Sequence, residues 1–235
     1  MSAVTDPLRR PIWSALTSRQ AGLTIGTARA KRFPGDISPF AATSPTDPGA
    51  LTEVAPLVDD GGSVIFLQEG AVPTPPGLAE RARAVGVQLV AAHVDPPAAT
   101  DQVLDLTAAD TADMVALATL TRPGPFLPRT NTLGPFVGIR DASGALVAMA
   151  GERLAVEGHT EVSGVCTHPD ARGRGYAALL SAVVATRILD RGEVPFLHAY
   201  ATNRPAIGLY RRLGFTVTRE VSVAAFGKPP VAAGR

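Results

Sequence analysis

The sequence predicts an α/β fold in which a mixed, mostly antiparallel sheet is flanked by helices. From residue 103 onward, strand-like and helix-like segments alternate in the order β, α, three β, α, β, α, β. The strand-like segments 136–141 and 145–153 flank the turn Asp141–Gly144, which is typical of an antiparallel hairpin. The composition, with 46% apolar and 18% charged residues, suits a chain that buries a sizeable core.

The length of 235 residues exceeds the ~150 typical of one domain, and the segment that follows Pro96 and Pro97 is a plausible boundary. We therefore expect two units, over residues 1–100 and 101–235. In the first unit, the patterns predict helices over 11–16, 50–58 and 78–85 and strands over 63–68 and 87–94. In the second unit, they predict strands over 103–107, 136–141, 145–153, 161–167, 194–201 and 215–226, and helices over 108–120, 176–191 and 205–213.

Composition also excludes several classes of protein. The net charge of +1 argues against a duplex-DNA binder, and we expect no nucleic-acid partner. No apolar run reaches the ~18 residues of a membrane span, and Met1–Arg10 has no secretory signal pattern, so we expect a cytoplasmic protein without a membrane partner. The single cysteine, Cys166, excludes an intrachain disulfide and a cysteine-built metal site, and we expect no metal.

The most informative segment is 165–177, in which a strand leads through a basic, glycine-containing loop into a long amphipathic helix. The first amides of a helix lack intrahelical acceptors, and the helix dipole adds positive charge there. Gly173 and Gly175 allow the backbone to approach a phosphate, while Arg172 and Arg174 attract it. No Gly-Lys-Ser/Thr follows, and the third glycine of a dinucleotide fingerprint is missing. The pattern therefore predicts a cradle for a pyrophosphate.

Two motifs in this unit resemble the signatures of the GNAT superfamily of N-acetyltransferases. One is Arg172-x-x-Gly175-x-Ala177, and the other is the segment 203–215, Asn-x-x-Ala-x-x-x-Tyr-x-x-x-Gly-Phe. The sequence around Cys166 and His198 is similar to that of the FR47-like branch of the superfamily. The resemblance covers residues 103–226 and implies a GNAT-like fold there. The alternation in the first unit then suggests a degenerate GNAT-like half that binds no CoA and walls the acceptor site.

The resemblance implies transfer of an acetyl group from acetyl-CoA, as co-substrate, to a small-molecule or peptide amine by direct attack. It implies that Tyr210 protonates the leaving thiolate and that Glu161 acts as the base, directly or through water. Asn203 would contact the CoA arm. The other cofactor-binding residues that it implies, which offer backbone groups to pantetheine or pyrophosphate, are Val165, Cys166, Thr167, Arg172, Gly173, Arg174, Gly175, Tyr176, Ala177 and Ala178.

Other interpretations remain open for these residues. Tyr210 could be a core aromatic, Glu161 an exposed carboxylate and Asn203 only a helix cap. We expect Cys166 to be a buried, inert thiol, and His198 either faces the acceptor or is a satisfied core histidine. The alternative functions are a non-catalytic acyl-CoA-binding regulatory module and a nucleic-acid interaction domain. The acceptor and the oligomeric state stay open, a homodimer being one expected form.

Overall fold

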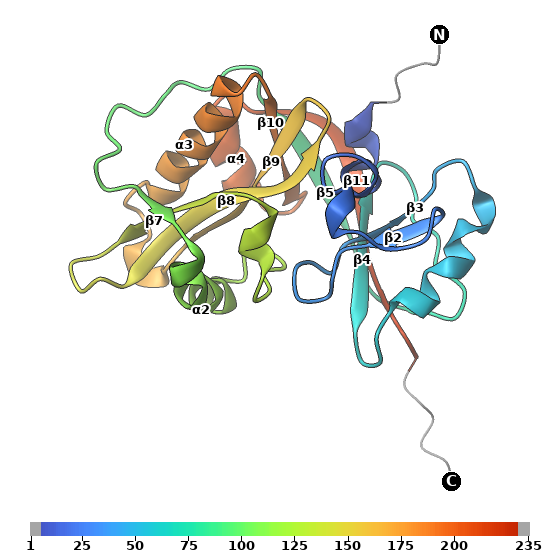
Figure 1. Cartoon of the computed structure of the whole chain (residues 1–235). Coiled ribbons are helices and arrows are strands. Elements are labelled where there is room, and N and C mark those ends of the chain that lie inside the picture. Colours follow the sequence, from blue (N-terminus) through green and yellow to red (C-terminus); the bar gives the residue numbers. More distant parts are fainter. Residues whose placement is uncertain (1–5, 230–235) are drawn as a thin grey trace.

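The computed structural model describes residues 6–229, which form an eight-stranded sheet, a three-stranded sheet and helices on both faces of the larger sheet (Figure 1). The strand order in the large sheet is β4-β11-β5-β10-β9-β8-β7-β6. Its strands are β4 (Ser63–Gln68), β5 (Ala79–Val90), β6 (Leu104–Leu106), β7 (Phe136–Arg140), β8 (Leu146–Val156), β9 (His159–Thr167), β10 (Val194–Tyr200) and β11 (Thr216–Gly227). Only β9 and β10 pair in parallel, which confirms the predicted mixed, mostly antiparallel sheet.

The helices cover the sheet because each presents an apolar face to it. On one face, α3 (Tyr176–Asp190) buries side chains such as Leu180 and Val184 against β7 to β10, with α4 (Arg204–Arg212) beside it. On the opposite face, α1 (Pro11–Thr17) packs on β8 and β10, and α2 (Thr111–Thr121) packs on β7 to β9. No helix within residues 6–229 is long and apolar enough to cross a membrane.

The N-terminal half contributes two strands to the large sheet and a small α/β arrangement of its own. The three-stranded sheet consists of β1 (Ile25–Gly26), β2 (Ala30–Arg32) and β3 (Ala41–Thr43). Strands β4 and β5 pair with β11, and β5 also pairs with β10. A division near residue 100 stays a prediction, and it would cut a continuous sheet between β5 and both of its neighbours.

Two predicted helices of the N-terminal half were wrong. The segment 78–85 is the first half of β5, which continues to Val90 and so shortens the strand expected over 87–94. The segment 50–58 forms two 3-10 helices, Pro48–Glu53 and Ala55–Leu57, rather than one α-helix. Pro56 has no backbone N–H for an α-helical hydrogen bond, which accounts for the interruption. The other predicted elements occur within a few residues of their expected bounds.

The large sheet opens between β9 and β10. These strands pair only where His159–Glu161 faces Val194–Phe196, after which β10 continues along β5 and β9 along β8. Gly164 has φ +65°, and the register between β8 and β9 shifts there. A Cβ at this glycine would lie 2.8 Å from the Phe136 ring, so the bulge that turns β9 away from β10 requires glycine.

Candidate functional site

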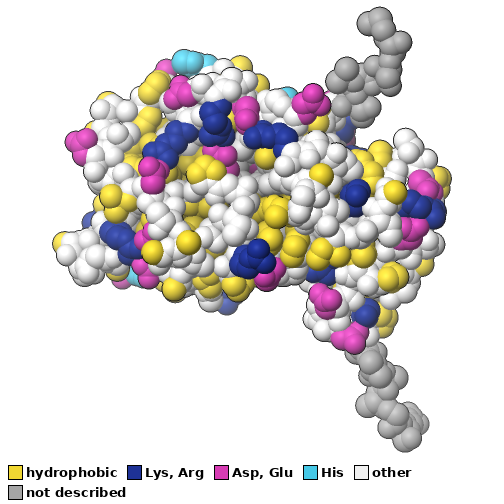
Figure 2. All heavy atoms as spheres, in the orientation of Figure 1, with side chains coloured by type: hydrophobic (Ala, Val, Ile, Leu, Met, Phe, Trp, Pro, Cys, Tyr) yellow, Lys and Arg dark blue, Asp and Glu magenta, His cyan; other side chains and the backbone are white. Residues whose placement is uncertain are grey.

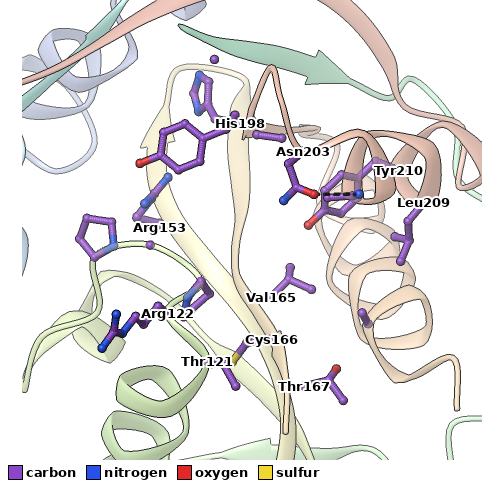
Figure 3. Close-up of a pocket in the computed structure, with 18 of the residues that line it drawn as sticks. Thr121, Arg122, Arg153, Val165, Cys166, Thr167, His198, Asn203, Leu209 and Tyr210 are labelled. Atoms are coloured by element: carbon purple, nitrogen blue, oxygen red, sulfur yellow. Dashed lines mark hydrogen bonds between the residues drawn. The ribbon is translucent and has the colours of Figure 1, made fainter. Parts of the chain in front are cut away.

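A cavity of about 630 Å³ lies where β9 and β10 separate (Figure 3). Its walls come from the end of β9, the loop that leads into α3, the helix α4, the segment after α2, and strands of the N-terminal half. It contains every predicted site residue except Glu161 and Arg174. The fold therefore brings together segments that are more than a hundred residues apart in the chain.

The predicted cradle opens into this cavity. Residues Arg172 to Ala178 are all part of its lining apart from Arg174, whose side chain borders a second hollow with His168 and Asp170. The first helical hydrogen bond of α3 runs from the Leu179 N–H to the Gly175 carbonyl, so the three preceding amides have no intrahelical acceptor. Gly173 and Gly175 have φ +78° and +80°, and no atom lies within 4 Å of a Cβ built at either. These features suit an anion.

Gly175 offers a direct test of the cradle. We expect Gly175→Ala to weaken acetyl-CoA binding about tenfold, because the loop would relax from its left-handed conformation and binding would have to restore it. Gly158→Ala is the matched control: Gly158 has φ +69° with open space around it, and it lies in the turn between β8 and β9. Calorimetric titration should show unchanged affinity for the control, and equal losses in both variants would refute the cradle.

Helix α4 places Asn203 and Tyr210 on the side of the cavity opposite Arg153 (Figure 3). The Asn203 side chain caps the helix, with Oδ1 accepting from the Ala206 N–H at 3.2 Å, and it also lines the cavity. Tyr210 packs edge-on against Phe215, with ring centroids 6.0 Å apart, and its hydroxyl points into the cavity on the side of Asn203 and Val165. Burial raises the pKa of Tyr210 to about 12, so its proton is held at any ordinary pH.

Strand β9 presents Val165, Cys166 and Thr167 to the cavity along the edge that β10 has left. The Thr167 hydroxyl oxygen is buried and has no partner among the described residues. Cys166 packs against α2, and burial raises the pKa of its thiol to about 11. A thiol with this pKa is almost entirely protonated near neutral pH, which suits the expected inert cysteine rather than a nucleophile.

Glu161 lies at the closed end of the opening, fully buried and outside the cavity lining. Its carboxylate accepts two hydrogen bonds from the Arg153 guanidinium, both 2.8 Å long, and one of 2.7 Å from His198 Nδ1. Burial by itself would raise the pKa of this carboxyl, but Arg153 and His198 together lower it to about 2. Glu161 is therefore an ionised anchor, and the exposed-carboxylate alternative is wrong.

Both ring nitrogens of His198 are occupied, although the ring lines the cavity. The Gln88 side-chain amide lies 3.0 Å from His198 Nε2 and donates at 2.9 Å to the Leu8 carbonyl. An amide nitrogen can only donate, so Nε2 accepts, and the proton of the neutral ring is on Nδ1, which donates a hydrogen bond to the Glu161 carboxylate. This series of hydrogen bonds, from Arg153 through Glu161, His198 and Gln88 to Leu8, gives both nitrogens of His198 a partner and links the two halves of the protein.

The N-terminal half supplies an apolar wall. Phe40, Ile65 and Leu67 line the cavity beside Val221 and Val223 of β11. The Arg153 guanidinium carbon lies 4.7 Å above the centre of the Phe40 ring. Figure 2 shows hydrophobic side chains across the middle of the molecule's face, with arginine and lysine side chains near them. The sequence led us to expect a wall from the N-terminal half, but it did not identify these wall residues, Arg153 or Gln88, because only the tertiary strand pairing brings them together.

Comparison with known proteins shows what the chain is similar to. The family model for FR47-like proteins matches residues 136–223. A solved structure of an acetyltransferase assigned to the GNAT family, from Novosphingobium aromaticivorans, is 37% identical; the match covers 96% of this chain and 100% of that one, with a TM-score of 0.90. None of the curated proteins compared with the chain matches it.

Two more distant structures share the fold alone. A GCN5-related N-acetyltransferase from Kribbella flavida is 20% identical over 94% of this chain and 97% of its own, with a TM-score of 0.59. A tandem GNAT protein from the clavulanic acid biosynthesis pathway is 14% identical over 86% of this chain and 78% of its own, with a TM-score of 0.53. The fold of the full chain, N-terminal half included, thus recurs in these proteins.

Proposed function

Because this chain belongs to the GNAT family of acetyltransferases, we propose that it transfers the acetyl group of acetyl-CoA directly to the nitrogen of an amine. The observation that carries the proposal is the shared cavity. The anion cradle of α3, the open edge of β9 and the Tyr210 hydroxyl all face the same space. That arrangement supports a mode of binding in which a nucleotide thioester would lie within reach of a proton donor.

Each predicted cofactor-binding group has a place in this proposal. The amides of Tyr176, Ala177 and Ala178, with the Arg172 side chain, would hold the pyrophosphate. The free edge of β9 at Val165, Cys166 and Thr167 would pair with pantetheine, beside Asn203. Gly173, Arg174 and Gly175 would contribute backbone groups to the cradle, and acetyl-CoA would supply the activated acyl group.

The reaction balances without a covalent enzyme intermediate. The neutral amine attacks the thioester carbonyl, a C–N bond forms, and the C–S bond of the tetrahedral intermediate then breaks. The oxyanion would be met by a strand amide near Val165. Tyr210 would give its proton to the leaving thiolate, or hydrogen-bond to it, and regain the proton from solvent. The products are the N-acetylated amine and CoA.

The amine must also lose a proton during the reaction. That Glu161 acts as the base stays a prediction. The structure offers it no direct route to the amine, since Glu161 lies outside the cavity lining and both nitrogens of the intervening His198 form hydrogen bonds. We propose instead that water in the cavity receives this proton, and that Glu161 holds the side chains of Arg153 and His198 in place. The rate would then follow deprotonation of the amine as the pH rises.

The acceptor is proposed to be a small-molecule or peptide amine that enters against the apolar wall of the N-terminal half. This position suits the expected role of that half as a wall of the acceptor site without CoA contacts. The single cysteine continues to favour the cytoplasm as the expected compartment.

A thiol-release assay with acetyl-CoA and a panel of amines tests the proposed function, together with calorimetric titration of acetyl-CoA. Binding together with amine-dependent thiol release would support the enzyme. Binding without release for any amine would favour the regulatory-module alternative, and no binding would overturn both.

A further inference from the structure

The charges that line the cavity are all of one sign. Among the described residues, the lining contains the arginines Arg122, Arg153 and Arg172, and neither aspartate nor glutamate. A second ammonium group on an acceptor would therefore lose its water near guanidinium groups, without a carboxylate to receive it. We therefore expect the cavity to disfavour polyamines and lysine-rich peptides.

Two of these arginines already have roles. Arg153 donates two hydrogen bonds to the Glu161 carboxylate, whose charge neutralises it. Arg172 belongs to the cradle at α3. Arg122 forms no ion pair within residues 6–229. It lies directly after α2, on the same side of β9 as Arg153 and across from Tyr210 (Figure 3).

The backbone at Arg122 indicates that its side chain has a use. Its φ of 51° makes it the one non-glycine residue of the described chain with a positive φ. The position ends α2, where glycine or asparagine would adopt the left-handed conformation at less cost. Strained residues of this kind cluster at ligand-binding sites, and here the strain lies on a cavity wall.

The opposite part of the wall is uncharged and apolar. The side chains of Phe40, Ile65, Leu67, Val221 and Val223 come from β4, β11 and the segment before β3. Each removes apolar surface of a ligand from water without offering it a hydrogen bond. The cavity lining thus combines a guanidinium that forms no ion pair within residues 6–229 with an apolar wall.

We propose that the acceptor is an α-amino acid with an apolar side chain, whose carboxylate pairs with Arg122 and whose side chain packs on the Phe40–Val223 wall. The inference rests on the proposed acetyl transfer, because the α-amine is the group that would be acetylated. An acceptor that the cavity selects would therefore carry one carboxylate, one amine and one apolar group.

Calorimetry with L-phenylalanine, phenethylamine and spermidine tests this selection, each titrated with and without saturating CoA. We expect L-phenylalanine to bind about tenfold more tightly than phenethylamine, which lacks only the carboxylate, and spermidine to bind most weakly. Equal affinity for the first two, or tighter binding of spermidine, would overturn the inference even if CoA binds and amines are acetylated. The titrations without CoA report on the cavity even if the proposed acetyl transfer fails.

Variants at Arg122 locate the carboxylate site. Arg122→Gln should remove the advantage of L-phenylalanine over phenethylamine and leave acetyl-CoA affinity unchanged. Arg122→Gly should do the same while raising the melting temperature, because glycine relieves the left-handed strain. Arg129→Gln is the matched control, since Arg129 lies in the same connection, outside the cavity, and pairs with Asp36. A preference that survives both Arg122 variants would refute the assignment.

Discussion

Replacing Tyr210 by phenylalanine is expected to lower turnover by a factor on the order of 10², the lower end of what a positioned proton donor contributes. The ring would stay packed against Phe215, so the fold should be unchanged. Because the pKa of Tyr210 is raised to about 12, the hydroxyl is protonated throughout any assay and is available as a donor. Steady-state kinetics at saturating amine should show the loss in kcat.

The affinity for acetyl-CoA separates this role from a structural one. Calorimetry should give the Tyr210→Phe variant an acetyl-CoA Kd within about twofold of the parent, since only a transition-state interaction is removed. An unchanged kcat would make Tyr210 a core aromatic. A parallel loss of acetyl-CoA affinity and melting temperature would assign the hydroxyl to binding or folding instead.

Replacing Glu161 by glutamine is expected to reduce the free energy of unfolding by about 3 kcal/mol, because Arg153 would stay buried beside a neutral partner. Chemical denaturation at neutral pH measures this change. Glu80→Gln is the matched control: Glu80 pairs with Arg83, their side chains are 38% and 40% exposed, and such exposed pairs contribute little. Equal losses in the two variants would contradict the proposed anchor.

The same carboxyl makes stability depend on pH. Its pKa is lowered from 4.5 to about 2 on folding, so its contribution is complete above about pH 5 and is lost as the pH falls toward 2. Acid unfolding of the parent should therefore be steeper over this window than that of Glu161→Gln. Between pH 6 and 9 the pH–rate profile of residual activity should keep its shape, and a shift there would restore Glu161 as the base.

The C-terminal half could be predicted well because its signals are local. Glycines, helical periodicity and the two motifs lie within short segments, and each element there appears near its expected position. The segment 78–85 misled because its alanine, glutamate and arginine residues favour a helix, and its mostly exposed side chains lack the alternation of a half-buried strand. Pairing with β11 overrides that preference.

The candidate site was predictable only in part, for the same reason. The cradle and Tyr210 lie on sequence motifs, and the cavity includes both. The environment of Glu161 depends on Arg153 and His198, which neighbouring strands bring to it. No local pattern could show that this carboxylate is buried and doubly bonded, or that Phe40 and Leu67 would face the same space.

The interleaved position of β5 has a consequence for how the chain matures. Both of its partner strands, β10 and β11, are made about a hundred residues or more after it on the ribosome. During synthesis, β5 therefore has no strand to pair with on either edge until the chain is nearly complete. Formation of the sheet then depends on contacts between residues far apart in the chain. A fragment that starts at residue 101 would leave a slot between β10 and β11 that strand β5 alone normally fills.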